Sequence, residues 1–254
     1  MWRIVRIAVL LTILAFVALG ALVDRWRTTD WDNTLWIGVF PVNADGRDRT
    51  GEYLARLDAA QFRDVEAFFA AQAHAHGVAL DRPVHVELYP ALDEAPPRLA
   101  PDAGLPGRVW WSLRARYFSW RVAGDRLAHV RLYVLYHDPD HTQAVPHSLG
   151  LQKGLFGIVH AYAEEPYEAT NSVVVVHELM HTLGATDKYD PATLLPSFPG
   201  GYAEPEAEPR YPQRLAEVMA GRVALSPGQA RMAESLHEVV VGPATAAEIG
   251  WVAQ

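Results

Sequence analysis

The feature that most constrains this chain is a pair of histidines four residues apart, with a glutamate directly after the first. His177, Glu178 and His181 fit the pattern H-E-x-x-H. Positions i and i+4 of an α-helix lie about one turn apart on the same face, so both imidazoles can reach one metal ion. Glu178 then lies beside that ion, where a carboxylate can take a proton from a bound water molecule. The pattern therefore predicts a helix that carries a metal site.

Two further positions extend the pattern. Gly184 follows His181 by three residues, and Asp187 follows Gly184 by three. A glycine can adopt the left-handed conformation that ends a helix, and the resulting turn can bring Asp187 back to the same ion as a third ligand. Tyr189 is near enough to act as a ligand or to support the transition state, although a packing role is equally consistent with its position.

Other ligand sets stay open on the sequence alone. A more distant glutamate can replace Asp187 as third ligand, and four candidates have suitable spacing: Glu204, Glu206, Glu208 and Glu217. We prefer Asp187 because this choice also gives Gly184 a role. Histidines and aspartates between His137 and His147 form either a second metal site or a polar loop. The loop is favoured, since no ligand spacing rule selects these residues.

Composition excludes some classes of protein. The chain has 254 residues, 50% of them hydrophobic, which is enough for one sizeable core or two lobes around a cleft. Its formal net charge is −8 and no basic run stands out, so a nucleic-acid partner is not expected. There is no cysteine. Zinc ligands must therefore be histidine, carboxylate or tyrosine.

The N-terminal region predicts a membrane segment. Ile7 to Val23 is a run of 17 residues without charge, preceded by Arg3 and Arg6. This length favours an uncleaved signal-anchor whose arginines stay in the cytoplasm, which places the rest of the chain in the periplasm or outside the cell. Small residues near Gly20 leave a cleaved signal peptide, and hence a secreted protein, as the alternative. We divide the chain into an anchor, residues 1–28, and a catalytic domain, residues 29–254.

Strand and helix signals alternate before the motif. Strands are expected over residues 34–42, 84–89, 129–136 and 155–163, and helices over 50–76, 226–236 and 245–251. Residues 108–122 are either helix or strand. Asn171 or Ser172 is the expected cap of the motif helix. The proline-rich segment 190–212 is expected to be an irregular loop.

The stretch from His177 to Asp187 resembles the metzincin zinc peptidases, whose pattern is H-E-x-x-H-x-x-G-x-x-H or, in some branches, has aspartate last. The aspartate form is similar to the snapalysin and immune-inhibitor-A types of secreted bacterial peptidase. The resemblance implies a zincin-like α+β fold. Its upper lobe would hold a twisted mixed sheet with helices, its lower lobe would be irregular or helical, and the active-site helix would lie between them.

The same resemblance implies a Zn²⁺ cofactor and a protein or peptide substrate. The substrate would lie along the edge strand just before the motif helix, for which residues 155–163 are the candidate. A methionine in a tight turn beneath the metal is also implied, and Met219 is the candidate, with an ordinary core methionine as the alternative.

Two functions follow from these observations. The first is a zinc-dependent metalloendopeptidase that hydrolyses peptide bonds with metal-activated water and Glu178 as general base. The second is a membrane-tethered binding or scaffold module that keeps the zincin fold without turnover. The position of Glu178 favours the first, because zinc sites that only support folding are normally closed by four protein ligands and need no such glutamate.

Overall fold

A computed structural model of the chain describes residues 2, 6, 7, 30–100, 102–123, 128–151 and 155–252. Among these residues, no helix has the length and apolar character needed to cross a membrane. The predicted anchor, residues 1–28, lies outside the described part of the chain except for residues 2, 6 and 7. The anchor therefore stays a prediction from the sequence.

A five-stranded mixed sheet with the strand order β2-β1-β3-β5-β4 forms the larger lobe. Four parallel strands build most of it: β1 (Leu35–Asn43), β2 (Val84–Leu88), β3 (Val130–His137) and β5 (Phe156–Tyr162). The short strand β4 (Leu149–Leu151) pairs antiparallel with β5 and forms one edge. β1 and β3 are buried along nearly their whole length, as expected for strands covered on both faces. The four predicted strands are confirmed.

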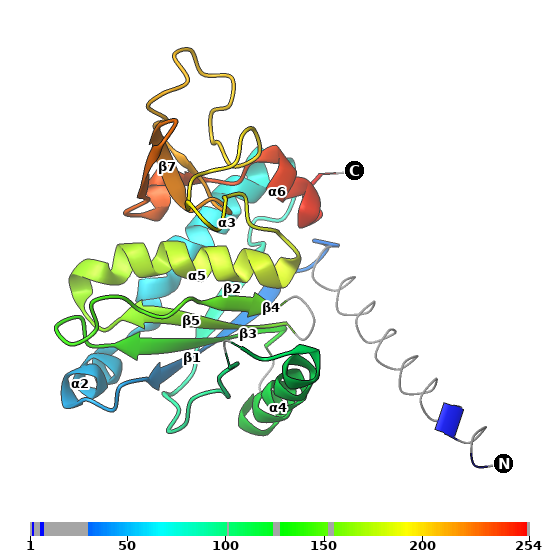
Figure 1. Cartoon of the computed structure of the whole chain (residues 1–254), viewed down its shortest axis with the longest axis vertical. Helices are drawn as coiled ribbons and strands as arrows, with labels where there is room; N and C mark the ends of the chain where they lie inside the picture. The colour runs from blue at the N-terminus through cyan, green and yellow to red at the C-terminus, as the bar shows by residue number, and fades with distance from the viewer. Residues whose placement is uncertain are drawn as a thin grey trace.

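Helices cover both faces of this sheet (Figure 1). α3 (Arg63–Ala75) and α5 (Glu168–Leu183) share one core with the first face, and α4 (Leu105–Ala123) packs on the second face through a separate apolar cluster. The ambiguous stretch around residues 108–122 is thus a helix. The prediction of a single helix over residues 50–76 is wrong. This stretch forms α2 (Asp48–Arg56), the 3-10 turn η1 (Ala59–Phe62) and α3, because Asp58 caps a new turn.

α5 carries the histidine motif and lies between the sheet and the C-terminal lobe (Figure 1). Its β-branched run 173–176 has poor helix propensity, but Val173, Val175 and Val176 are all buried. Burying such a side chain contributes about 1.5–3 kcal/mol, which exceeds a propensity cost of at most about 0.7 kcal/mol per residue. Asn171 does not cap the helix, which begins three residues earlier. Its amide group instead exchanges two hydrogen bonds with the backbone of Tyr162 and fastens α5 to β5.

The C-terminal lobe is made of short elements and loops. They are the paired strands β6 (Ala216–Glu217) and β9 (Val239–Val240), the hairpin of β7 (Arg222–Ser226) and β8 (Gln229–Met232), the 3-10 turn η3 (Leu236–Glu238) and the helix α6 (Pro243–Glu248). Another 3-10 turn, η2 (Glu165–Tyr167), directly precedes α5. The helix expected over 226–236 is wrong, because Pro227 and Gly228 form the turn of a hairpin instead of a helix start. The segment 190–212 is irregular, as predicted. The two lobes with α5 between them confirm the α+β, zincin-like fold class.

Candidate metal centre

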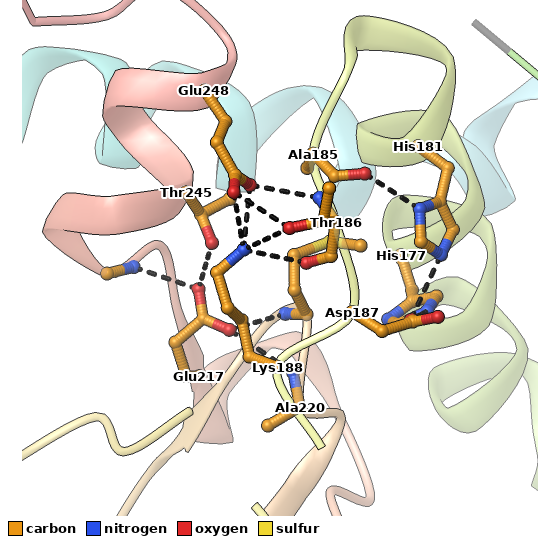
Figure 2. A network of polar contacts seen from close by, with 12 residues as sticks. His177, His181, Ala185, Thr186, Asp187, Lys188, Glu217, Ala220, Thr245 and Glu248 are labelled. Carbon is orange, nitrogen blue, oxygen red and sulfur yellow. Dashed lines mark hydrogen bonds and ion pairs between the residues drawn. The ribbon is translucent and has the colours of Figure 1, made fainter. Parts of the chain in front are cut away.

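The chain turns back sharply at the end of α5. Leu183 is the last helical residue, and Gly184 follows with a φ of +109°, a left-handed conformation. The backbone N–H of Ala185 donates to the carbonyl of Met180 at 3.0 Å and closes the helix end. Any other residue would be strained at this φ, so the turn depends on glycine. The loop that follows brings Asp187 to the face of α5 that presents the two histidines (Figure 2).

His177, His181 and Asp187 converge on one point. The Nε2 atoms of His177 and His181 lie 3.3 Å and 3.2 Å from Oδ1 of Asp187. One ligand atom from each residue lies within 4.8 Å of the others, and no second group of this kind occurs among the described residues. Ligand atoms around a tetrahedral zinc ion with bonds of about 2.0–2.1 Å are separated by about 3.3 Å. The two separations from Asp187 therefore match those in a zinc site.

The backbone fixes the orientation of both imidazoles. Nδ1 of His177 lies 2.9 Å from the carbonyl oxygen of Val218, and Nδ1 of His181 lies 2.9 Å from that of Ala185. A carbonyl oxygen only accepts hydrogen bonds, so each Nδ1 carries the hydrogen and each neutral ring keeps its Nε2 lone pair. Two such lone pairs facing the carboxylate of Asp187 repel it unless a cation lies between them. Two imidazole nitrogens and a carboxylate oxygen thus fit zinc.

The pKa values of Asp187 and His181 also show that this cluster attracts positive charge. Burial acts to raise the pKa of Asp187, but its interaction with the two adjacent imidazoles outweighs burial and holds that pKa well below its usual range. Burial acts to lower the pKa of His181, while Asp187 and the carbonyl of Ala185 raise it, and the net shift is upward. The carboxylate of Asp187 is therefore an anion at neutral pH.

Glu178 provides a buried carboxylate beside this cluster. The residue is only 6% exposed, and its Oε2 has no hydrogen-bond partner among the described residues. The backbone N–H of Gly150 on β4 lies near this carboxylate and favours its charged form. Burial raises the pKa of Glu178 above its ordinary value, and the nearby imidazoles partly oppose this shift. A carboxylate with a free buried oxygen and a raised pKa is suited to accept and return a proton.

The residues on either side of Asp187 are anchored to α6. Glu248 accepts hydrogen bonds from the backbone N and Oγ1 of Thr186 at 2.9 and 2.8 Å. It also forms an ion pair with Nζ of Lys188 at 2.7 Å, and the same Nζ donates to the carbonyl of Thr186 at 2.8 Å. Figure 2 shows this network on the side of the loop away from the histidines. Glu248 therefore holds the backbone that presents Asp187, a role that local sequence did not indicate.

Met219 lies in a tight turn, as the resemblance implied, and its side chain is fully buried. The turn contacts the candidate metal centre through its backbone. The carbonyl of Val218 accepts from His177, and the carbonyl of Met219 accepts from the backbone N–H of Lys188 at 2.9 Å. Gly221 completes the turn with a φ of +64°. The turn thus supports one histidine and the Asp187 loop together.

A buried glutamate, Glu217, holds this turn in place. One carboxylate oxygen accepts from the backbone N–H groups of Met219 and Ala220 at 2.7 and 3.2 Å. The other accepts from the backbone N–H of Gly242 and from Oγ1 of Thr245 at 3.2 and 2.6 Å. Burial raises the pKa of Glu217, and these donors oppose the shift. Glu217 is therefore an anchor of the turn, although its spacing alone made it a candidate ligand.

The other candidate ligands do not join the cluster. Four glutamates were considered as a distant third ligand, Glu204, Glu206, Glu208 and Glu217, and none belongs to the ligand group found among the described residues. Glu204 instead forms an ion pair with Arg214. Tyr189 is half-buried, and burial and the charge of nearby Asp187 raise the pKa of its phenol. Of the additional candidates, the structure brings only Tyr189 to the site.

The histidines and aspartates between residues 137 and 147 do not form a metal-ligand group among the described residues. Nε2 of His137 lies 2.9 Å from Nδ1 of His160, and both rings are buried. Asp138 forms an ion pair with Arg49 at 3.6 Å. Partners within the protein thus account for His137 and Asp138.

The strand beside the candidate centre is β4, and the expectation that residues 155–163 form the edge is wrong. β5 lies between β3 and β4, because the chain first runs antiparallel through 149–151. A Cβ on Gly150 would lie 2.4 Å from the carbonyl oxygen of Glu178 and 2.5 Å from Cβ of His181. Only glycine allows this close approach. A lone glycine between Leu149 and Leu151 was the available signal.

No family model matches the chain, and no curated protein does. Two crystal structures of wild-type OgpA from Akkermansia muciniphila are similar to it at 15% identity, with TM-scores of 0.47 and 0.46, and they cover 85% and 87% of this chain. Catalytically inactive OgpA in complex with an O-glycopeptide substrate, glycodrosocin, matches at 13% identity with a TM-score of 0.45. The chain covers 59%, 62% and 59% of these three chains. Likeness at this distance carries no argument about the chemistry of this chain.

Proposed function

We propose that this chain is a zinc-dependent metallopeptidase with His177, His181 and Asp187 as metal ligands and Glu178 as general base. The observation that carries the proposal is the convergence of two Nε2 atoms and Oδ1 of Asp187, at 3.3 and 3.2 Å, next to a buried carboxylate oxygen without a partner among the described residues. Three protein ligands leave one position for water or substrate, as catalytic zinc sites do.

In this proposal the protein's own groups move the proton. Bound zinc would lower the pKa of a water molecule and polarise the carbonyl of the bond to be cleaved. Oε2 of Glu178 accepts the proton and returns it to the leaving amine. The raised pKa of Glu178 favours the second transfer, because the protonated form then persists closer to neutral pH. Tyr189, whose side chain lies near Asp187, supports this ligand.

The substrate we propose is an extended peptide segment. β4 has one hydrogen-bonded neighbour, β5, in the described sheet, so its outer edge can pair with a peptide backbone. Gly150 places this edge directly against the residues of α5 that carry the proposed chemistry. We also propose that residues 29–254 form the catalytic unit, and that the apolar run from Ile7 to Val23 anchors or exports it, so that it acts outside the cytoplasm.

The test is zinc analysis of the full-length chain together with digestion of a broad peptide library. Glu178→Gln should keep one zinc ion per chain and lose about 10²–10⁴-fold in cleavage rate, the contribution typical of a general base. Glu165→Gln, at an exposed position, is the matched control and should leave both quantities unchanged. If the Glu178 variant bound zinc and cleaved as fast as the unaltered chain, the mechanism would be wrong. If neither zinc nor cleavage were found, a binding or scaffold module would be favoured.

A further inference from the structure

α4 presents a large apolar and aromatic surface to solvent. Six of its side chains are more than half exposed: Leu105 78%, Val109 55%, Trp110 64%, Leu113 56%, Tyr117 63% and Trp120 71%. The opposite side of the helix already covers the sheet through Trp111, Ala115 and Phe118. Single exposed apolar residues are ordinary on a protein surface, but six on one helix form a patch of the kind that contacts another phase or molecule.

The six side chains, which we call the α4 stripe, share one face. At about 100° per residue they fall within an arc of about 140°, centred opposite the buried side chains. Arg108 and Arg114 lie beyond the two ends of this arc, and Arg116 lies just inside one end. α4 contains four arginines and no acidic residue, in a chain whose net charge is −8. The exposed face thus has an apolar centre and positively charged borders.

The arginines at the two borders have no acidic partner in the part of the chain that the structure describes. Arg121 is paired with Glu94, and Nε of Arg108 donates to the carbonyl of Ala103. Within the described residues no carboxylate forms an ion pair with Arg108 or Arg114. Their charge therefore remains available to an anionic partner.

We propose that α4 lies on the surface of a membrane that contains anionic lipids, with the α4 stripe at the boundary between headgroups and acyl chains. Helices that lie in this plane combine a Trp- and Leu-rich face with basic borders. Trp and Tyr favour the interfacial layer, and the arginine side chains can extend along it to reach lipid phosphates. A second copy of the chain fits the α4 stripe less well, because face-to-face packing would bring the arginines of both copies together.

The position of α4 is compatible with an active site that faces water. α4 covers the sheet face opposite to α5, so a membrane beneath α4 and the candidate metal centre lie on different sides of the sheet (Figure 1). The predicted anchor ends at Val23, and Asp30 is the first residue of the described domain. The segment between them spans at most about 25 Å when extended. A membrane-inserted anchor would therefore keep the domain close to the bilayer.

The absence of cysteine allows a direct test on the full-length chain in vesicles. Leu113→Cys, in the α4 stripe, and Leu225→Cys, on the β7–β8 hairpin at 38% exposure, are each labelled with an environment-sensitive fluorophore. The vesicles contain either phosphatidylcholine alone or phosphatidylcholine with about 30% phosphatidylglycerol, which supplies a negative surface potential. We expect a several-fold, blue-shifted rise in fluorescence at position 113 on the anionic vesicles and no change at position 225.

Charge provides the second arm of the test. Changing both Arg108 and Arg114 to Glu in the Leu113→Cys background should abolish the response, with circular dichroism confirming that the helix content is kept. High salt should weaken the response of the unaltered helix, which requires no mutation. The proposal is wrong if position 113 does not respond, or if it responds equally to neutral vesicles and after the charge reversal. The final control uses lipid-free detergent solution. If the fluorescence at position 113 and the molar mass from light scattering both rise with protein concentration there, the partner is a second copy and the proposal is wrong.

Discussion

Replacing Glu248 with alanine should weaken zinc binding without touching a proposed ligand. Glu248 holds both neighbours of Asp187 through hydrogen bonds from Thr186 and an ion pair with Lys188. Without these contacts the backbone that presents Asp187 loses one of its supports. Metal binding must then order the loop, and the free energy of ordering is subtracted from the affinity.

The size of this effect follows from the contacts that are lost and from those that remain. Hydrogen bonds to charged groups contribute about 1.5–3 kcal/mol, whereas exposed ion pairs contribute at most about 1 kcal/mol. The side chain of Glu248 is 30% exposed, so its contacts are partly weakened by water. Lys188 also keeps two backbone hydrogen bonds, with Met219 at 2.9 Å and Ser197 at 2.7 Å. A loss of about 2 kcal/mol is reasonable, which is about 30-fold in affinity and within the range for residues that support metal ligands.

The assay is competition for zinc between the full-length chain and a chromophoric chelator. Glu238→Ala is the matched control, because Glu238 is a carboxylate of the same lobe that pairs with Arg231 at 2.8 Å, away from the ligand loop. Both variants should lose some thermal stability, but only Glu248→Ala should lose zinc affinity. Equal affinities for Glu248→Ala and the unaltered chain would show that the loop does not depend on this carboxylate.

Three further results are expected. Gly184→Ala should lower the free energy of unfolding by about 1–2 kcal/mol, measured by thermal unfolding, and should also weaken zinc binding. The control Gly46→Ala, at a φ of +69° in an open turn, should lower stability without affecting zinc binding. Gly150→Ala should reduce peptide cleavage, because its Cβ would lie 2.4 Å from a carbonyl oxygen of α5, and Gly228→Ala, with no atom within 4 Å of its added Cβ, should cleave normally. Burial, with a contribution from His137, lowers the pKa of His160 to about 4. The folded chain therefore binds fewer protons here than the unfolded chain, and stability should fall by up to about 3 kcal/mol as the pH drops from 6.5 towards 4. NMR titration of His160 should show the neutral ring down to that pH, and a ring that titrates near 6.5 would contradict this.

The parts of the site that depend on local rules could be predicted from the sequence. The register from His177 to Asp187 needs only the helical period and the left-handed freedom of Gly184, and the structure places these residues as expected. The parts that depend on distant contacts could not. Glu217 and Glu248 act on residues brought to them by the fold, and a carboxylate that binds backbone N–H groups has no spacing pattern of its own.

The errors in the predicted fold have a similar origin. The edge of the sheet was assigned to 155–163 because this is the last strongly apolar stretch before the motif, whereas the edge strand β4 is only three residues long. Pro227 and Gly228 suit a helix start and a hairpin turn equally well, and pairing between β7 and β8 decided between them. Burial, in contrast, explains why the valine-rich run of α5 is helical despite its propensity.

The hydrogen bond from His177 to the carbonyl of Val218 joins a helix packed on the sheet to a turn of the C-terminal lobe. If the proposed zinc ion binds here, its affinity and the packing of this turn against α5 are thermodynamically linked, because His177 loses the acceptor that fixes its tautomer when the packing is lost. By reciprocity, bound zinc would stabilise this packing by the same factor.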